Sequence, residues 1–256
     1  MLQLMQSDWQ RMWKRKKTLV SLLIFVGIVL LDCLFLNMQH LGAFDNVSTV
    51  PLTAQNFSLF LLKEVSFFLV LIIGPILMID SFNGEYHAGQ LRLVLIRPIS
   101  VMRMLAAKWI NLAIVMALFL LVTFAVGEIF GHLFKPSVDT VVFLNPDRSY
   151  DPAGAFLYCL ESYGLFMLIM LAQLSLTGLI CTALPSPIIC YLGWVGIAVG
   201  SMYVSDTFSF LLFGISTVFE WMAGSYAHAF VLPVMICMIL GFAVTMLWWH
   251  RRNWVK

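Results

Sequence analysis

The chain has 256 residues, of which 61% are apolar and only 11% charged, and its mean hydropathy is +0.94. A soluble domain typically carries about 25% charged residues. No soluble fold of this size can bury so much apolar surface, so the composition excludes a soluble protein and requires lipid as the solvent. The net charge of +2 says little about partners, and we expect no nucleic acid among them.

Residues 1–17 predict an amphipathic helix that lies in the membrane interface. Apolar residues, among them Trp9 and Met12, recur at three- and four-residue spacing. Polar residues, among them Asp8 and Arg11, fill the other positions. Aromatic residues on one face and cations on the other favour a helix that rests on the bilayer without crossing it. A frayed tail with basic anchors is the alternative.

Six apolar runs follow, and they predict six transmembrane helices. We place these spans at residues 18–38, 57–79, 101–131, 156–183, 188–205 and 229–249. Residues 206–228 are too apolar for a free loop and too interrupted by Gly214, Glu220 and Gly224 for a span, so we expect an external re-entrant or interfacial hairpin. The predicted fold is an all-α integral membrane protein, with residues 1–256 forming one transmembrane permease domain.

The basic residues orient the predicted bundle, because lysine and arginine concentrate on the cytosolic side of membrane proteins. One side carries only Lys135 and Arg148, and Lys63 lies within a span. The other side carries twelve basic residues: Arg11, Lys14, Arg15, Lys16, Lys17, Arg92, Arg97, Arg103, Lys108, Arg251, Arg252 and Lys256. We therefore expect both termini in the cytosol and a multi-pass protein of a bacterial plasma membrane.

Sequence motifs for nucleotide or metal chemistry are absent. The chain has no GxxxxGK[ST], HExxH or GxSxG pattern, and its five histidines are scattered. Its five cysteines fall in or beside apolar runs without a CxxC pair, which is typical of small apolar residues in helices. We expect no catalytic residues, no metal site and no cofactor in this chain.

Residues 80–100 form the one long charged stretch between two spans. Together with the start of the third span, this stretch resembles the signature of type-2 ABC transporter permeases. In that family an acidic residue after the second span is followed by a Glu, a Gly, an apolar pair, a Pro-x-Ser and a Lys that opens the third span. The matching residues here are Asp80, Glu85, Gly89, Leu93 to Leu95, Pro98, Ser100 and Lys108. Gln90 departs from the pattern, since the family often has Thr there.

The resemblance implies that residues 80–100 are a cytosolic coupling segment, whose short helix sits in a groove of a separate ATPase subunit. Glu85 and Arg92 would offer charge to that surface, and Tyr86 an anchor. Pro98 ends one helical piece and Ser100 begins the next. An ordinary cytosolic loop is the alternative. Residues 185–187 are a second plausible contact or a plain turn.

Asp32 and the pair Lys63 and Glu64 lie within predicted spans, where charge is expensive and usually has a function. Counted from the cytosolic ends at about 1.5 Å per residue, Asp32 lies roughly 21 Å and Lys63 roughly 25 Å into the membrane. We expect Asp32 and Lys63 to pair, and Glu64 to face a polar cavity or a partner subunit. The alternative is that these residues snorkel outward from the span ends.

The function that we expect is the membrane subunit of an ABC exporter of an amphipathic compound such as a peptide, antibiotic or lipid-like molecule. Two cytosolic ATPase chains would bind ATP and Mg, and a second permease subunit, identical or paralogous, would complete the path. Two other classes remain open. An ion-gradient-driven secondary transporter would work without an ATPase, and a non-transporting membrane scaffold would move no cargo.

Overall fold

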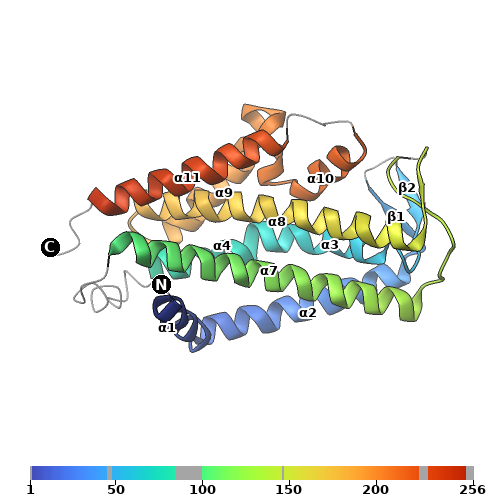
Figure 1. Ribbon diagram of the computed structural model, residues 1–256, viewed down its shortest axis with the longest axis horizontal. Coiled ribbons are helices and arrows are strands. Elements are labelled where there is room, and N and C mark those ends of the chain that lie inside the picture. The colour runs from blue at the N-terminus through green and yellow to red at the C-terminus, as the bar shows by residue number, and fades with distance from the viewer. Residues whose placement is uncertain (1, 45–47, 85–99, 146, 225–229, 252–256) are drawn as a thin grey trace.

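The computed structural model describes residues 2–44, 48–84, 100–145, 147–224 and 230–251. Over these residues the chain forms an elongated bundle of helices, with two small β-hairpins at one end (Figure 1). Six helices are long and apolar enough to cross a membrane. The predicted class, an all-α integral membrane protein with six candidate spans, is therefore confirmed.

The helices follow the predicted runs closely, with differences at several ends. The helical elements are α1 (Leu2–Trp13), α2 (Lys16–Met38), α3 (Phe57–Phe68), the π-helix η1 (Leu69–Ile73), α4 (Gly74–Ile79), the π-helix η2 (Asp80–Gly84), α7 (Val101–Phe134), α8 (Pro152–Ala183), α9 (Pro187–Val204), the 3₁₀-helix η3 (Asp206–Leu211), α10 (Gly214–Met222) and α11 (Val231–Arg251). The strands are β1 (Leu41–Ala43), β2 (Thr49–Pro51), β3 (Val141–Val142) and β4 (Ser149–Tyr150).

α8 begins four residues before the predicted span because its N-terminal signals lie outside the apolar run. The side chain of Asp151 accepts a hydrogen bond from the backbone N–H of Gly154 at 3.1 Å, as an N-cap does. Pro152 occupies the first helical position, where its missing N–H costs nothing. The helix therefore extends beyond the stretch that must be apolar.

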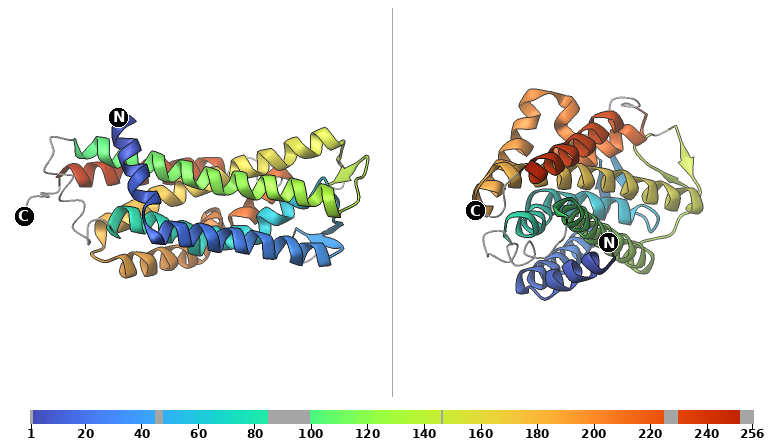
Figure 2. Two further views of the ribbon diagram at one scale, coloured as in Figure 1. Left: turned by 90° about the horizontal axis from the view of Figure 1, so that it is seen from below. Right: turned by 60° about the vertical axis from the view of Figure 1, so that its left-hand side comes forward.

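The two ends of the bundle differ in structure and in charge. α1 crosses one end at a steep angle to the long helices, and we call this the α1 end (Figure 2). The starts of α2 and α7 and the last turn of α11 lie there, whereas both β-hairpins lie at the opposite, hairpin end (Figure 1). At the hairpin end the Lys135 Nζ donates to the carbonyls of Asn37 and Gln39 at 3.0 and 2.9 Å, where a cation also complements the C-terminus of α2.

The second span is one continuous helical run over residues 57–84, built from α3, η1, α4 and η2. The predicted end at residue 79 is therefore too early. Asp80 opens the final π-helical turn of this span, and Ser81, Phe82 and Asn83 behind it are buried. The predicted coupling segment thus begins on a packed helix.

Residues 206–222 form η3 and α10, which pack between α9 and α8 beside the hairpin end (Figure 1). α10 has nine residues and is about 13 Å long, too short to cross a bilayer. Phe219 on α10 is buried and meets Phe44 edge-on, with ring centroids 5.0 Å apart. The described part of the predicted hairpin is thus a pair of short helices that do not cross the membrane.

The polar loops that follow α2 and α7 contain short strands that the sequence did not predict. β1 and β2 pair antiparallel with Gly42 opposite Val50, and β3 and β4 pair with Val141 opposite Tyr150. Near the hairpin end α7 approaches α3 closely at Gly127, where a Cβ would lie 2.8 Å from the Cα of Ser58. A side chain at this position would push the two spans apart.

Candidate functional site: a charged clamp at the α1 end

Lys108, near the start of the third span, is fully buried beneath α1. Its Nζ lies 3.3 Å from Asp8 Oδ1 and donates to the carbonyl of Ser81 at 3.1 Å. Asp8 is itself only 5% exposed. One ammonium group therefore links α1, the end of the second span and the start of the third.

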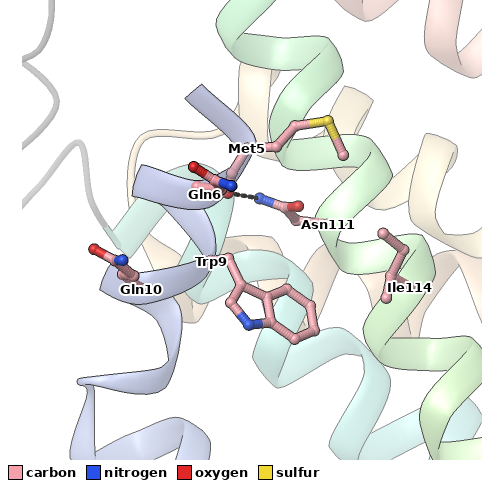
Figure 3. A pocket seen from close by; sticks show the side chains of 6 residues that line it. All are labelled: Met5, Gln6, Trp9, Gln10, Asn111 and Ile114. Carbon is pink, nitrogen blue, oxygen red and sulfur yellow. Dashed lines mark hydrogen bonds between the residues drawn. The ribbon is translucent and has the colours of Figure 1, made fainter. Parts of the chain in front are cut away.

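Asp8 receives two further donors. The Arg11 guanidinium lies 3.1 Å from Oδ1, and the Asn111 Nδ2 donates to Oδ2 at 3.0 Å. Asn111 Nδ2 also donates to the carbonyl of Met5 at 3.0 Å, as Figure 3 shows. A buried carboxylate with this many donors is satisfied, which is what makes its burial tolerable.

Asp80 forms a second set of ion pairs with the junction of α1 and α2. Arg15 donates to Asp80 Oδ2 at 2.9 Å and Lys17 to Oδ1 at 3.0 Å. The Arg15 and Asp80 side chains are 19% and 18% exposed, whereas Lys17 is 75% exposed. Arg15 therefore carries most of this interaction, because solvent screens the exposed lysine.

These two sets of contacts join the helices that precede and follow residues 85–99 to the N-terminal region. Asp80 and Ser81 precede the segment, Lys108 follows it, and all three bind residues between 8 and 17 or each other. We call the set the α1 clamp. Its members are Asp8, Arg11, Arg15, Lys17, Asp80, Ser81, Lys108 and Asn111.

Three of the eight predicted coupling residues belong to the described structure. Asp80 and Lys108 are members of the clamp, but among the described residues each forms its ion pairs with the N-terminal region and not with the other. Ser100 is the N-cap residue of α7 by position, but its side chain is exposed and makes no capping hydrogen bond. Five predicted residues lie outside the described residues: Glu85, Tyr86, Gly89, Arg92 and Pro98.

Six of the eight clamp residues were not among the predicted site residues: Asp8, Arg11, Arg15, Lys17, Ser81 and Asn111. Asp8 was assigned to the polar, outward side of the amphipathic helix, but the structure buries it against α7. Its position was a usable signal, because Asp8 lies one turn before buried Met12 and is the only acidic residue in the first 31. Asn111 follows Lys108 by three residues and so shares its helix face.

The predicted pair between Asp32 and Lys63 does not form. Lys63 Nζ donates to the carbonyl of Ala43 in β1, because the residue sits two turns from the hairpin end and its long stem reaches the loop. Asp32 Oδ2 is buried and has no hydrogen-bond partner among the described residues. The outward snorkelling alternative fits Lys63.

The second span contains a π-helical break in its middle, at η1. Pro75 lacks an N–H, so the carbonyl of Leu71 loses its helical donor. The Tyr191 hydroxyl of α9 donates to this carbonyl at 3.0 Å. π-helical turns are frequent at functional sites, so the break marks a position to test.

A neighbouring carbonyl at the break receives two side-chain donors. Val70 O accepts from Gln173 Nε2 at 2.7 Å and from Trp194 Nε1 at 3.1 Å. Gln173 and Trp194 are both buried, and Gln173 Oε1 has no hydrogen-bond partner in the part of the chain that the structure describes. A Cβ on Gly74 would lie 2.5 Å from the carbonyl of Leu69, so the bulge requires glycine there. α8 and α9 thus supply side-chain donors to the carbonyls that the π-helical turn leaves without a helical partner.

The described residues show no gathering of three or more His, Cys, Asp or Glu side chains that could ligate a metal. The arrangement instead offers ion pairs and helix breaks, which position helices. It defines a multi-pass membrane protein of six candidate spans with a charged clamp at one end.

Residues 23–192 match the family described as a protein of unknown function, DUF2705, and the chain belongs to this family. The matched residues reach from within α2 to within α9, so they include the second span and Lys108. A search of curated proteins finds no match to the chain.

Proposed function

We propose that this chain is the membrane subunit of an ABC transporter, driven by a separate cytosolic ATPase that binds the segment 80–100. The observation that carries the proposal is the α1 clamp, which joins the helices on both sides of residues 85–99 to the N-terminal region. The sequence resemblance to type-2 ABC permeases falls on the same stretch.

The clamp suits a coupling role because it joins three helices at one point. A force on residues 85–99 acts on Asp80 and Ser81 at one end and on the start of α7 at the other. Lys108 contacts both Ser81 and Asp8, so these helices and α1 move together. Farther along, the break at η1 gives the second span a place to bend.

The charge distribution supports a cytosolic location for the α1 end. Among the described residues, eight cations lie at or near that end: Arg11, Lys14, Arg15, Lys16, Lys17, Arg103, Lys108 and Arg251. Lys135 and Arg148 lie at the hairpin end. By the positive-inside rule the α1 end faces the cytosol, where an ATPase would reach residues 85–99.

The complete transporter would contain two ATPase chains, which bind ATP and Mg, and two permease subunits, identical or paralogous, in a bacterial plasma membrane. Its cargo class would be an amphipathic compound leaving the cell.

Co-purification tests this proposal. The tagged chain is expressed with its genomic neighbours and purified in detergent, beside the variant Glu85→Ala/Arg92→Ala. A matched variant, Asp139→Ala/Arg148→Ala, removes the same two charges at exposed positions of the hairpin end. We expect an ATPase to accompany the wild type and the matched variant but to be lost from the first. The absence of any ATPase from the wild type would contradict the proposal.

A second candidate function is an ion-gradient-driven transporter, favoured by the buried Asp32 Oδ2, which has no hydrogen-bond partner among the described residues. Intramembrane acids of this kind carry protons in many transporters. In that case transport would persist without an ATPase and would be lost in Asp32→Asn. Transport that requires ATP and survives Asp32→Asn would exclude this candidate.

A further inference from the structure

A groove of about 520 Å³ lies between α1 and the start of α7 (Figure 3). This volume is within the usual range for a small-molecule site. The described lining residues are Met5, Gln6, Trp9 and Gln10 of α1 with Asn111 and Ile114 of α7. The groove adjoins the α1 clamp, because Asn111 belongs to both.

The lining changes from polar to apolar across the groove. Gln6 and Gln10 are exposed and offer amide groups on the α1 side. Trp9 lies between the two helices and Ile114 forms the wall on α7 (Figure 3). Asn111 uses its Nδ2 to hold α1, and its Oδ1 is turned away from α1. The groove is therefore amphipathic and suits an amphipathic occupant.

The apolar side of the groove continues onto a surface that faces lipid. Ile114, Leu118 and Leu121 are 40%, 40% and 63% exposed, and their spacing places them on one face of α7. α7 is a candidate membrane span, so acyl chains cover this face. A chain that runs along this face can enter the groove at Ile114.

The polar side of the groove continues toward two lysines, Lys14 and Lys16. Lys14 lies one helical turn beyond Gln10, and its N–H donates to the Gln10 carbonyl at 3.1 Å. Lys14 and Lys16 are exposed, and neither makes an ion pair within the described ranges. An anionic group beside Gln10 would meet this charge without competing with the clamp.

We propose that the groove between α1 and α7 binds an anionic phospholipid of the surrounding bilayer. Its acyl chain lies against Ile114 and Trp9, and its headgroup phosphate lies at Gln10 and Lys14. A phospholipid supplies the apolar and the anionic part in one molecule, which matches both sides of the groove. Because the lipid contacts α1 and α7 together, its binding stabilises the docking of α1. The proposal does not depend on the transport function.

Native mass spectrometry of the purified full chain tests the proposal. The protein in detergent is mixed with phosphatidylglycerol or phosphatidylcholine, and the fraction that retains one lipid is measured. We expect phosphatidylglycerol to be retained about fivefold better, which is the effect of one lysine near an anionic headgroup. Lys14→Gln should abolish the preference and leave phosphatidylcholine unchanged.

Ile114→Trp fills the groove and should reduce phosphatidylglycerol retention to the phosphatidylcholine level. Ile129→Trp is the matched control, since Ile129 is 63% exposed on the far part of α7. If Ile114→Trp does not fold, Gln10→Glu supplies the same test by placing an anion beside the headgroup. Equal retention of the two lipids by the wild type would overturn the proposal. So would undiminished retention in the folded groove variant, or another protein bound in the groove in place of lipid.

Discussion

Lys108 Nζ lies 3.3 Å from Asp8 Oδ1, which joins two residues that are 100 positions apart in the chain. Both side chains are buried, so the pair has lost its contact with water. A buried ion pair need not add stability over an apolar pair of the same size, but the loss of one member leaves an uncompensated charge. The contact therefore specifies where α1 docks.

Lys108→Met should lower the free energy of unfolding by about 2 kcal/mol, because Asp8 loses its buried ammonium donor and keeps only Arg11 and Asn111 among the described residues. Equilibrium unfolding in detergent measures this change. Arg103→Met is the matched control, since Arg103 is exposed on the same helix, and it should have almost no effect.

The double variant Asp8→Asn/Lys108→Met should lose much less stability than the sum of the two single variants. Residues in direct contact couple by about 0.5–3 kcal/mol in such a cycle. If the two single effects simply added, the pair would not be the interaction that docks α1.

In the second set of ion pairs, Arg15 should contribute far more than Lys17 to the stability that Asp80 provides. Arg15→Gln should cost about 1 kcal/mol, and Lys17→Gln should cost almost nothing because its side chain is 75% exposed. Asp80→Asn should resemble Arg15→Gln. Unfolding measured at low and high salt checks the assignment, since only the Lys17 contribution should disappear with salt. An effect of Lys17→Gln equal to that of Arg15→Gln would contradict this ranking.

The carbonyl of Val70 has two donors, so either donor alone should be nearly dispensable. Trp194→Phe keeps the Gln173 amide in place, and Gln173→Leu removes an unpartnered buried Oε1 together with one donor. Each single change should therefore shift stability by less than about 1 kcal/mol. The double variant leaves the buried Val70 carbonyl without a side-chain donor. It should lower the free energy of unfolding by about 1–3 kcal/mol more than the sum of the two single changes. Strict additivity in the unfolding measurement would exclude this shared role.

Asp32 and Lys63 should be energetically independent, because Lys63 binds the Ala43 carbonyl instead. The coupling between Asp32→Asn and Lys63→Met in an unfolding cycle should not exceed about 0.5 kcal/mol. A coupling energy above 1 kcal/mol would contradict this and would support the Asp32–Lys63 ion pair that the sequence predicts.

The spans were predictable because the bilayer fixes the length of an apolar helix. The run from Val101 shows this well, since its predicted start is the start of α7 and its end differs by three residues. The end of the second span was not predictable in the same way. Asp80 marks a change in composition, but the helix continues to Gly84 because Ser81, Phe82 and Asn83 pack against the bundle.

The site was predictable only where it coincided with a motif. Asp80 and Lys108 were selected by the family resemblance, but their partners were not, since an amphipathic pattern assigns every polar residue to the outside. Asp8 breaks that rule because α7 presents Lys108 and Asn111 to it. The position of Lys63 Nζ depends on the fold of the loop after α2, which hydropathy does not encode.

The central claim is that residues 85–99 contact an ATPase, and site-specific photocrosslinking in cells tests it most directly. A photoreactive residue is placed at position 92, and at position 148 of the hairpin end as the control. The account predicts that position 92 alone crosslinks to an ATP-hydrolysing protein. The absence of such a crosslink at position 92, or an equal one at position 148, would contradict it.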